Sequence, residues 1–173
     1  MNRTYQYYVE GPDDKKVVES LKKDLKCIIS GKVEVLNVVQ NIISKTRIRM
    51  LTSGITVILV YDTDKPNTQI LEKNIAALKA DKRINKVICI PQVENLEDEL
   101  ERSCNIKSVK EITKSKTKTG FKKDVLRCNN LDKRLIDCGF NINMFWSKVP
   151  DNCFKAIGND SIQVKIQRKS KSR

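Results

Sequence analysis

Apolar residues follow two patterns that alternate along this chain as far as about residue 104. Short continuous runs rich in β-branched or aromatic residues predict strands, and such runs occur at 5–9, 33–38, 55–61 and 86–90. The segments between and after them repeat apolar residues at helical spacing, which predicts helices at about 13–26, 40–51, 70–79 and 94–103. Strands that alternate with helices are typical of βαβ units. We therefore expect an α/β fold with a central, mostly parallel sheet of about four strands flanked by helices.

The pattern weakens after residue 104. Residues 114–120 form a polar, basic loop without an apolar anchor, and residues 121–138 have the spacing of one or two amphipathic helices. A small aromatic cluster over Asn141–Trp146 is suited to closing the domain. The predicted parts are a main α/β domain (1–104), a basic loop with a small helical C-terminal extension that packs on it (105–155), and a basic tail expected to be disordered when free (156–173).

Charge indicates the class of partner. Lys and Arg total 34 against 21 Asp and Glu, which gives a formal net charge of +13. The basic residues concentrate in 107–127 and 165–173, which favours nucleic acid as the partner over a merely solvated, Lys-rich surface. No stretch approaches the roughly 20 apolar residues of a membrane span, and the N-terminus lacks a signal-peptide core. We therefore expect a cytoplasmic protein that does not associate with membranes.

The chain contains six Cys and no His. Without His, the usual zinc sites and Cys–His nucleophile pairs are excluded, and the Cys spacings do not suggest an all-thiolate metal site. Reduced thiols in a cytosolic protein are the simplest interpretation.

Acidic residues follow two of the predicted strands. Glu10 comes directly after the first strand, with Asp13 and Asp14 close behind, and Asp62-Thr63-Asp64 comes after the third. Because parallel strands end at one edge of a sheet, we expect these carboxylates to gather where ligands bind in such folds. Gathered carboxylates repel one another unless a cation lies between them, and hard divalent ions select carboxylate oxygens. The sequence therefore predicts Mg²⁺, or Mn²⁺, as a cofactor.

In this order, the two acidic motifs resemble those of the Toprim domain, which topoisomerases, bacterial primases, M5-type ribonucleases and OLD-family nucleases share. They stand here as Tyr8-Val9-Glu10-Gly11-Pro12-Asp13-Asp14 and Val60-Tyr61-Asp62-Thr63-Asp64. The resemblance covers about residues 5–103 and implies a Rossmann-like Toprim fold of the standalone, OLD-like or M5-ribonuclease-like kind. It also implies that Glu10 acts as a general acid/base or metal ligand, and that Asp62 and Asp64 hold Mg²⁺ against a phosphodiester. Metal ions supply this chemistry without a His.

Four further residues are site candidates, each with a simpler alternative. Glu94, or else Glu97, resembles the carboxylate that completes a second metal site in standalone Toprim proteins, and the alternative is a solvated acidic first turn of a helix. Asp14 matches the family's trailing Asp, a candidate metal ligand, although capping of the following helix is the interpretation that we favour. Lys65 is either a phosphate contact or, as we prefer, a solvated loop residue.

The basic segment supplies candidate nucleic-acid contacts. Such residues hold the phosphate backbone and carry little sequence information. The candidates are Lys114, Lys116, Lys118, Lys122, Lys123 and Arg127. The resemblance further implies that a lysine from this region reaches the catalytic site, with Lys118 or Lys122 as the choice.

The leading hypothesis is a small, metal-dependent nuclease that acts on RNA or DNA, in RNA maturation or in a mobile-element or phage-defence setting. The second is a non-catalytic nucleic-acid-binding or regulatory Toprim module. A haloacid dehalogenase-like phosphatase with Asp62 as nucleophile ranks last, because its Asp-x-Asp normally follows the first strand. The chain shows no Gly-x-x-x-x-Gly-Lys loop, so any ATP use requires a separately encoded ATPase partner. Assembly as a homodimer is an open alternative.

Overall fold

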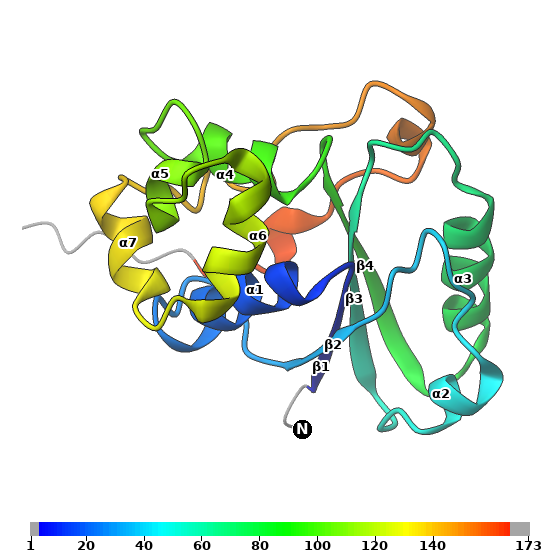
Figure 1. Cartoon of the computed structure of the whole chain (residues 1–173). Coiled ribbons are helices and arrows are strands. Elements are labelled where there is room, and N and C mark those ends of the chain that lie inside the picture. The colour runs from blue at the N-terminus through cyan, green and yellow to red at the C-terminus, as the bar shows by residue number, and fades with distance from the viewer. Residues whose placement is uncertain (1–3, 167–173) are drawn as a thin grey trace, which may run out of the picture.

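The computed structural model describes residues 4–166 of the chain. Within these residues, four strands form one sheet in which every neighbouring pair is parallel. The strands lie in the order β2-β1-β3-β4 (Figure 1). Their bounds are β1 Tyr5–Val9, β2 Lys32–Val35, β3 Ile55–Asp62 and β4 Ile84–Gln92. The α/β class and the parallel sheet expected from the sequence are therefore confirmed.

Helices lie on both sides of the sheet (Figure 1). The helix α1 lies on one side with α4 to α7, whereas α2 and α3 lie on the other. Right-handed crossovers explain this division, because the chain moves one way across the sheet from β1 to β2 and the opposite way from β2 to β3 and β4. The bounds are α1 Pro12–Lys23, α2 Lys45–Arg49, α3 Gln69–Ala80, α4 Leu96–Ser103, α5 Lys110–Thr113, α6 Lys118–Arg127 and α7 Leu131–Asp137.

Each side of the sheet has its own hydrophobic core. The side chains of β3 alternate between them: Ile58 and Val60 belong to the core that includes α1, and Val57, Leu59 and Tyr61 to the core that includes α3. A strand buried on both faces needs apolar side chains at every position. This double burial explains why the sequence of β3 is an almost unbroken apolar run.

The segment between β2 and α2 is an irregular loop, so two predicted boundaries were wrong. The strand expected over 33–38 ends at Val35, and the helix expected over 40–51 is confined to Lys45–Arg49. The cause is Asn74 of α3, whose Nδ2 donates to the main-chain oxygens of residues 38 and 41 and whose Oδ1 accepts from the main-chain N of residue 43, each at 2.8 Å. Because a distant side chain satisfies these main-chain groups, the loop needs no strand or helix of its own.

The fourth strand is longer than expected. The strand expected over 86–90 begins at Ile84 and continues through Pro91, a residue that usually ends a strand, to Gln92. Pro91 is tolerated because β4 is an edge strand. On the outer edge of β4, the main-chain N of Cys89 donates to Asp160 Oδ2 at 3.1 Å, and its main-chain O accepts from the main-chain N of Asp160 at 2.8 Å. Pro91 lies two residues further along the strand, so its main-chain N points to this same outer edge. The missing N–H therefore costs no hydrogen bond to β3, and Gln92 reaches the carboxyl edge of the sheet.

The helical C-terminal region follows the sequence pattern with local differences. The segment 121–138 forms two helices, as one of the alternatives predicted, but the loop expected over 114–120 ends early because Thr117 caps α6 by accepting from the N of Gly120 at 3.0 Å. Phe145 and Trp146 of the predicted aromatic cluster are buried, with ring centroids 4.6 Å apart.

The segment expected to be a disordered tail is packed over 156–166. Its Val164 is buried and accepts a main-chain hydrogen bond from Ile29, and Ile166 donates to the main-chain oxygen of Cys27. Two short 3-10 helices, η1 (Cys153–Ala156) and η2 (Ser161–Gln163), precede these contacts. Residues 167–173 of the expected tail lie outside the described residues. In the described part of the chain, no helix is long and apolar enough to span a bilayer.

Replacing Asn74 by Ala is expected to destabilise the fold by about 3 kcal/mol, because the substitution leaves three main-chain groups, two of them buried, without their partner. Urea unfolding followed by circular dichroism measures the change. Lys73→Ala is the control, since Lys73 is the preceding residue of α3 and is exposed. A loss from Asn74→Ala no larger than the loss from Lys73→Ala would contradict the role given to Asn74.

Candidate functional site

The strand order places a topological switch point between β1 and β3. From β1 the chain passes outward to β2, and from β3 it passes outward to β4, so the two central connections diverge. Open parallel sheets bind ligands in the crevice at such a point. Glu10 directly follows β1 and Asp62 ends β3, and Glu10 Oε2 accepts a hydrogen bond of 3.4 Å from the main-chain N of Asp62. Two of the three principal candidate residues are thus brought together here.

Gln92, which the sequence analysis missed, links two of the acidic residues. Its Nε2 donates to Asp14 Oδ1 at 2.7 Å and to Asp62 Oδ1 at 2.8 Å. Its Oε1 accepts from the indole Nε1 of Trp146 at 3.1 Å. Gln92 is 1% exposed and Trp146 is fully buried. The sequence signal that could have identified Gln92 was its position at the end of a strand. It was missed because the expected strand ended at residue 90, two residues before Gln92.

Asp14 caps the first helix, as we favoured, and also lies beside Asp62. Its Oδ2 accepts at 3.0 Å from the main-chain N of Gly11, the N-cap residue of α1, in the manner of a capping box. Its other oxygen accepts from Gln92, and its side chain is buried. The carboxyl group of Asp14 is therefore held at the acidic site by a hydrogen bond on each oxygen.

The clustered carboxyl groups have raised pKa values. Burial, with repulsion from Asp14 and Glu10, raises the pKa of Asp62 to about 9. Burial, with repulsion from Asp13, raises the pKa of Asp14 to about 7. Burial also raises the pKa of Glu10, and the charge of Asp64 adds to this increase. Unfavourable charge gathered in this way is relieved by a bound cation, and strongly perturbed groups concentrate at functional sites.

Lys122 is the lysine of the basic segment that reaches the acids. From α6, its Nζ lies 3.7 Å from Asp13 Oδ2 and 3.5 Å from Glu97 Oε1. Partial burial lowers the pKa of Lys122, but its acidic neighbours, Glu97 foremost, raise that pKa overall. Lys118 instead pairs with Glu101 at 3.0 Å. The structure thus brings Lys122 to Asp13 of the acidic site with Glu97 beside it, whereas Lys118 pairs with Glu101 and lines a hollow with Glu97 and Lys122.

The remaining candidates are exposed residues around the acidic site or in the basic segment. Asp64 and Lys65 are exposed, and their charges act on Glu10 in opposite directions. Glu94 is exposed as well: its main-chain N and O bond Thr63, and within residues 4–166 its carboxylate makes no recorded hydrogen bond or ion pair. The basic candidates that are exposed without a recorded ion pair in this range are Lys114, Lys116, Lys123 and Arg127.

The donors of the acidic site suit a hard divalent cation, since they are carboxylate oxygens. Within residues 4–166, however, no group of three or more His, Cys, Asp or Glu side chains is arranged to hold a metal ion. The carboxamide of Gln92 already bridges Asp14 and Asp62, and Asp64 is exposed. The donor types therefore fit a metal, and closing a coordination sphere beside Asp62 requires an exposed carboxylate, such as that of Asp64, to turn towards it.

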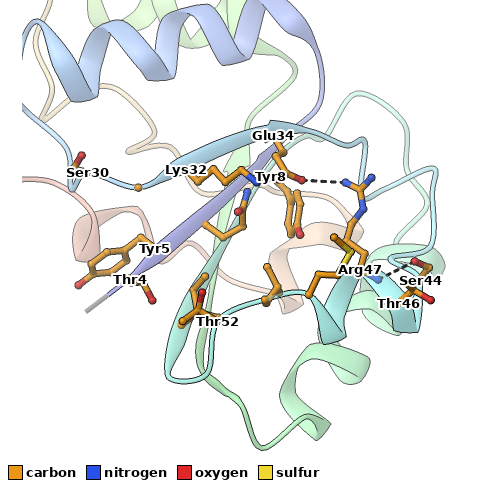
Figure 2. A pocket seen from close by; sticks show the side chains of 15 residues that line it. Thr4, Tyr5, Tyr8, Ser30, Lys32, Glu34, Ser44, Thr46, Arg47 and Thr52 are labelled. Atoms are coloured by element: carbon orange, nitrogen blue, oxygen red, sulfur yellow. Dashed lines mark hydrogen bonds and ion pairs between the residues drawn. The ribbon is translucent and has the colours of Figure 1, made fainter. Parts of the chain in front are cut away.

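A separate cavity of about 760 Å³ lies away from the acids, towards the amino ends of β1 and β2 (Figure 2). Figure 2 shows Arg47 of α2 reaching Glu34 of β2 above the ring of Tyr8. Glu34 pairs with Arg47 at 3.3 Å and with Lys32 at 2.6 Å. Because Lys32 and Arg47 are both already paired with Glu34, the cavity offers little to identify a ligand, and the acidic site remains the candidate.

Comparisons of the chain with protein-family models, with curated proteins and with solved structures found no match. The fold class therefore rests on the observed sheet. The Toprim resemblance rests on the two acidic motifs, and the function has to be argued from the geometry and charge of the acidic site.

Asp62→Asn is expected to change how stability depends on pH. The raised pKa of Asp62 means that the folded state binds this proton more tightly than the unfolded state, so this carboxyl group stabilises the fold below about pH 4 and the stabilisation is lost as pH rises towards 9. Asn has no such proton, and its oxygen can still accept from Gln92. The variant should show a higher Tm than wild type at about pH 8 and a similar Tm near pH 4.

Asp151→Asn is the matched control for this experiment, because Asp151 is exposed. Its Tm should follow that of the wild-type protein at both pH values. A Tm for Asp62→Asn below the wild-type value near pH 8 would show that the carboxylate of Asp62 is stabilised rather than destabilised in the fold.

Proposed function

We propose that this protein is a metal-dependent nuclease that hydrolyses phosphodiester bonds of RNA or DNA. The observation that carries the proposal is the contact between Glu10 and Asp62 at the switch point, with Asp14 beside them. Acidic motifs after β1 and β3 of a parallel sheet also support a Toprim-type, Rossmann-like fold as the finer classification.

Glu10, Asp62 and Asp64 are the proposed ligands of Mg²⁺ or Mn²⁺. A divalent cation bound there neutralises charge on the phosphate and makes a water molecule nucleophilic. Among the chain's own groups, Glu10 is half-buried and burial raises its pKa, which suits a carboxyl group that takes up and releases a proton during catalysis. Further candidate ligands are Asp14, Glu94 and Glu97.

Lys122 supports a phosphate-containing substrate. Its side chain is 58% exposed, and its contacts with Asp13 and Glu97 are long enough for the ammonium group to turn towards a phosphate oxygen. Lys123 and Arg127 continue along α6, and Lys114 and Lys116 precede that helix. Cations that extend away from a catalytic centre fit a polymer better than a small phosphate ester, so nucleic acid is the proposed substrate.

A non-catalytic nucleic-acid-binding module is the second candidate. One observation favours it: within residues 4–166, no group of three or more His, Cys, Asp or Glu side chains is arranged to hold a metal ion. Both candidates predict binding to nucleic acid, but only the first predicts turnover.

The nuclease proposal predicts cleavage of labelled single- or double-stranded RNA or DNA that requires Mg²⁺ or Mn²⁺ and stops with EDTA. Asp62→Asn and Glu10→Gln should each lower the cleavage rate by about 100-fold or more, because each removes a charge that the metal or the transferred proton requires. Gel electrophoresis of the products measures the rate.

Asp151→Asn, an exposed Asp outside the acidic site, should cleave at the wild-type rate. Cleavage that survives in Asp62→Asn would place the active site elsewhere. Binding of nucleic acid without any cleavage, across all four substrates and both metals, would instead favour the non-catalytic module.

The exposed end of α6 is expected to contribute electrostatic affinity. The double variant Lys123→Ala/Arg127→Ala should weaken binding of a labelled oligonucleotide and reduce the slope of log K against log salt by about 1 to 2, since up to two phosphate contacts are lost. Fluorescence anisotropy at several salt concentrations measures this slope.

The matched control for the α6 variant is Lys73→Ala/Lys79→Ala, which removes two exposed lysines from α3 on the other side of the sheet. This control should keep the wild-type slope. Equal slopes for both double variants would mean that binding depends on net charge rather than on the surface of α6.

A further inference from the structure

The carboxamide of Gln92 is held in one orientation. Its Nε2 faces two carboxylates, and its Oε1 faces the indole N–H of Trp146. An indole nitrogen can only donate a hydrogen bond, whereas a carboxyl group can accept one whether or not it is protonated. Turning the amide over would place its N–H groups against the indole N–H, so Trp146 determines which end of Gln92 meets the acids.

Trp146 is itself fixed by buried contacts. Its main-chain N donates to Glu99 Oε2 at 2.9 Å, and its main-chain O accepts from Ser161 Oγ at 2.6 Å and from Asn159 Nδ2 at 2.9 Å. Its ring packs against Phe145. The indole N–H is therefore presented to Gln92 by a rigid part of the C-terminal region.

The C-terminal region makes a second contact with the acidic site. Asn152 Nδ2 donates at 3.1 Å to the main-chain oxygen of Thr63, the residue between Asp62 and Asp64. Thr63 is buried, and its N donates to the main-chain oxygens of Gln92 and Glu94. The turn that carries the two aspartates is thus held by β4 on one side and by Asn152 on another.

We propose that Gln92 and Trp146 are positioning residues of the metal site, through which the C-terminal region sets the geometry of the Asp14 and Asp62 carboxylates. Burial of a carboxamide costs free energy unless its hydrogen bonds are made. The Gln92 carboxamide donates to the carboxyl groups of Asp14 and Asp62 and accepts from Trp146, the residue that orients it. Partners that orient metal-binding carboxylates typically change metal affinity by 10- to 100-fold. The inference rests on the proposed function.

The test uses metal binding and the fluorescence of Trp146, the chain's single tryptophan. In the wild-type protein, titration with Mn²⁺ should change the emission of Trp146 with the same midpoint as the loss of free Mn²⁺ measured by electron paramagnetic resonance. Gln92→Met, which keeps the side-chain length without its hydrogen bonds, should lower Mn²⁺ affinity about tenfold or more and abolish the emission change at the wild-type midpoint.

Two further variants complete the experiment. Trp146→Phe keeps an aromatic ring but loses the indole N–H, and it should also lower Mn²⁺ affinity about tenfold in the resonance measurement. If Gln92→Met does not fold, the Mn²⁺ affinity of Trp146→Phe and the emission change of the wild-type protein still test the proposal. Gln69→Met is the matched control, because Gln69 is exposed on α3, and it should bind Mn²⁺ like the wild-type protein.

The outcomes separate this inference from the proposed function. A wild-type protein that binds no Mn²⁺ overturns the metal-dependent function and the inference with it. Wild-type binding that is retained in Gln92→Met and Trp146→Phe, or that leaves the emission of Trp146 unchanged, overturns the inference alone and leaves the metal site standing.

Discussion

Repulsion among carboxyl groups at one edge of the sheet is the constraint on which the rest of the acidic site depends. Parallel strands bring Glu10 and Asp62 to the switch point, and the first turn of α1 adds Asp14. The protein opposes this repulsion with donors rather than with a buried positive charge. Gln92 donates to two of the carboxylates, and main-chain N–H groups donate to Glu10 and Asp14. The raised pKa values of Asp62 and Asp14 show that the compensation is incomplete. Binding of a cation would therefore be favoured there.

The acidic site is built from more of the chain than its two motifs suggest. Lys122 and Trp146 both come from beyond residue 104, yet Lys122 meets Asp13 and Glu97, and Trp146 orients Gln92. Their contacts make the helical C-terminal region part of the acidic site as well as a cover for one side of the sheet. The sheet determines which strands carry the carboxylates, and the C-terminal region adds contacts around them.

The distribution of charge suits a polyanionic substrate. The chain has a formal net charge of +13, but acidic side chains gather at the switch point. Among the exposed cations of α6, Lys122 lies beside these acids, and Lys123 and Arg127 follow it along the helix. A phosphate backbone is attracted by the basic surface and repelled by the uncompensated acids. A divalent cation would reverse that local repulsion, which links metal binding to substrate binding in the proposed nuclease.

Sequence periodicity was sufficient to predict the parallel sheet, most of α1 and the placement of acidic residues after β1 and at the end of β3. These features depend on residues close together in the sequence, because the spacing of apolar side chains differs between helices, strands buried on one face and strands buried on both faces. The loop organised by Asn74, the passage of β4 through Pro91 and the bridge made by Gln92 were decided by the tertiary structure. In each case a buried or edge polar group is satisfied by a residue far away in the chain: Asn74, Asp160 or Trp146. Such partners meet only once the chain has folded, so no local sequence pattern predicts them.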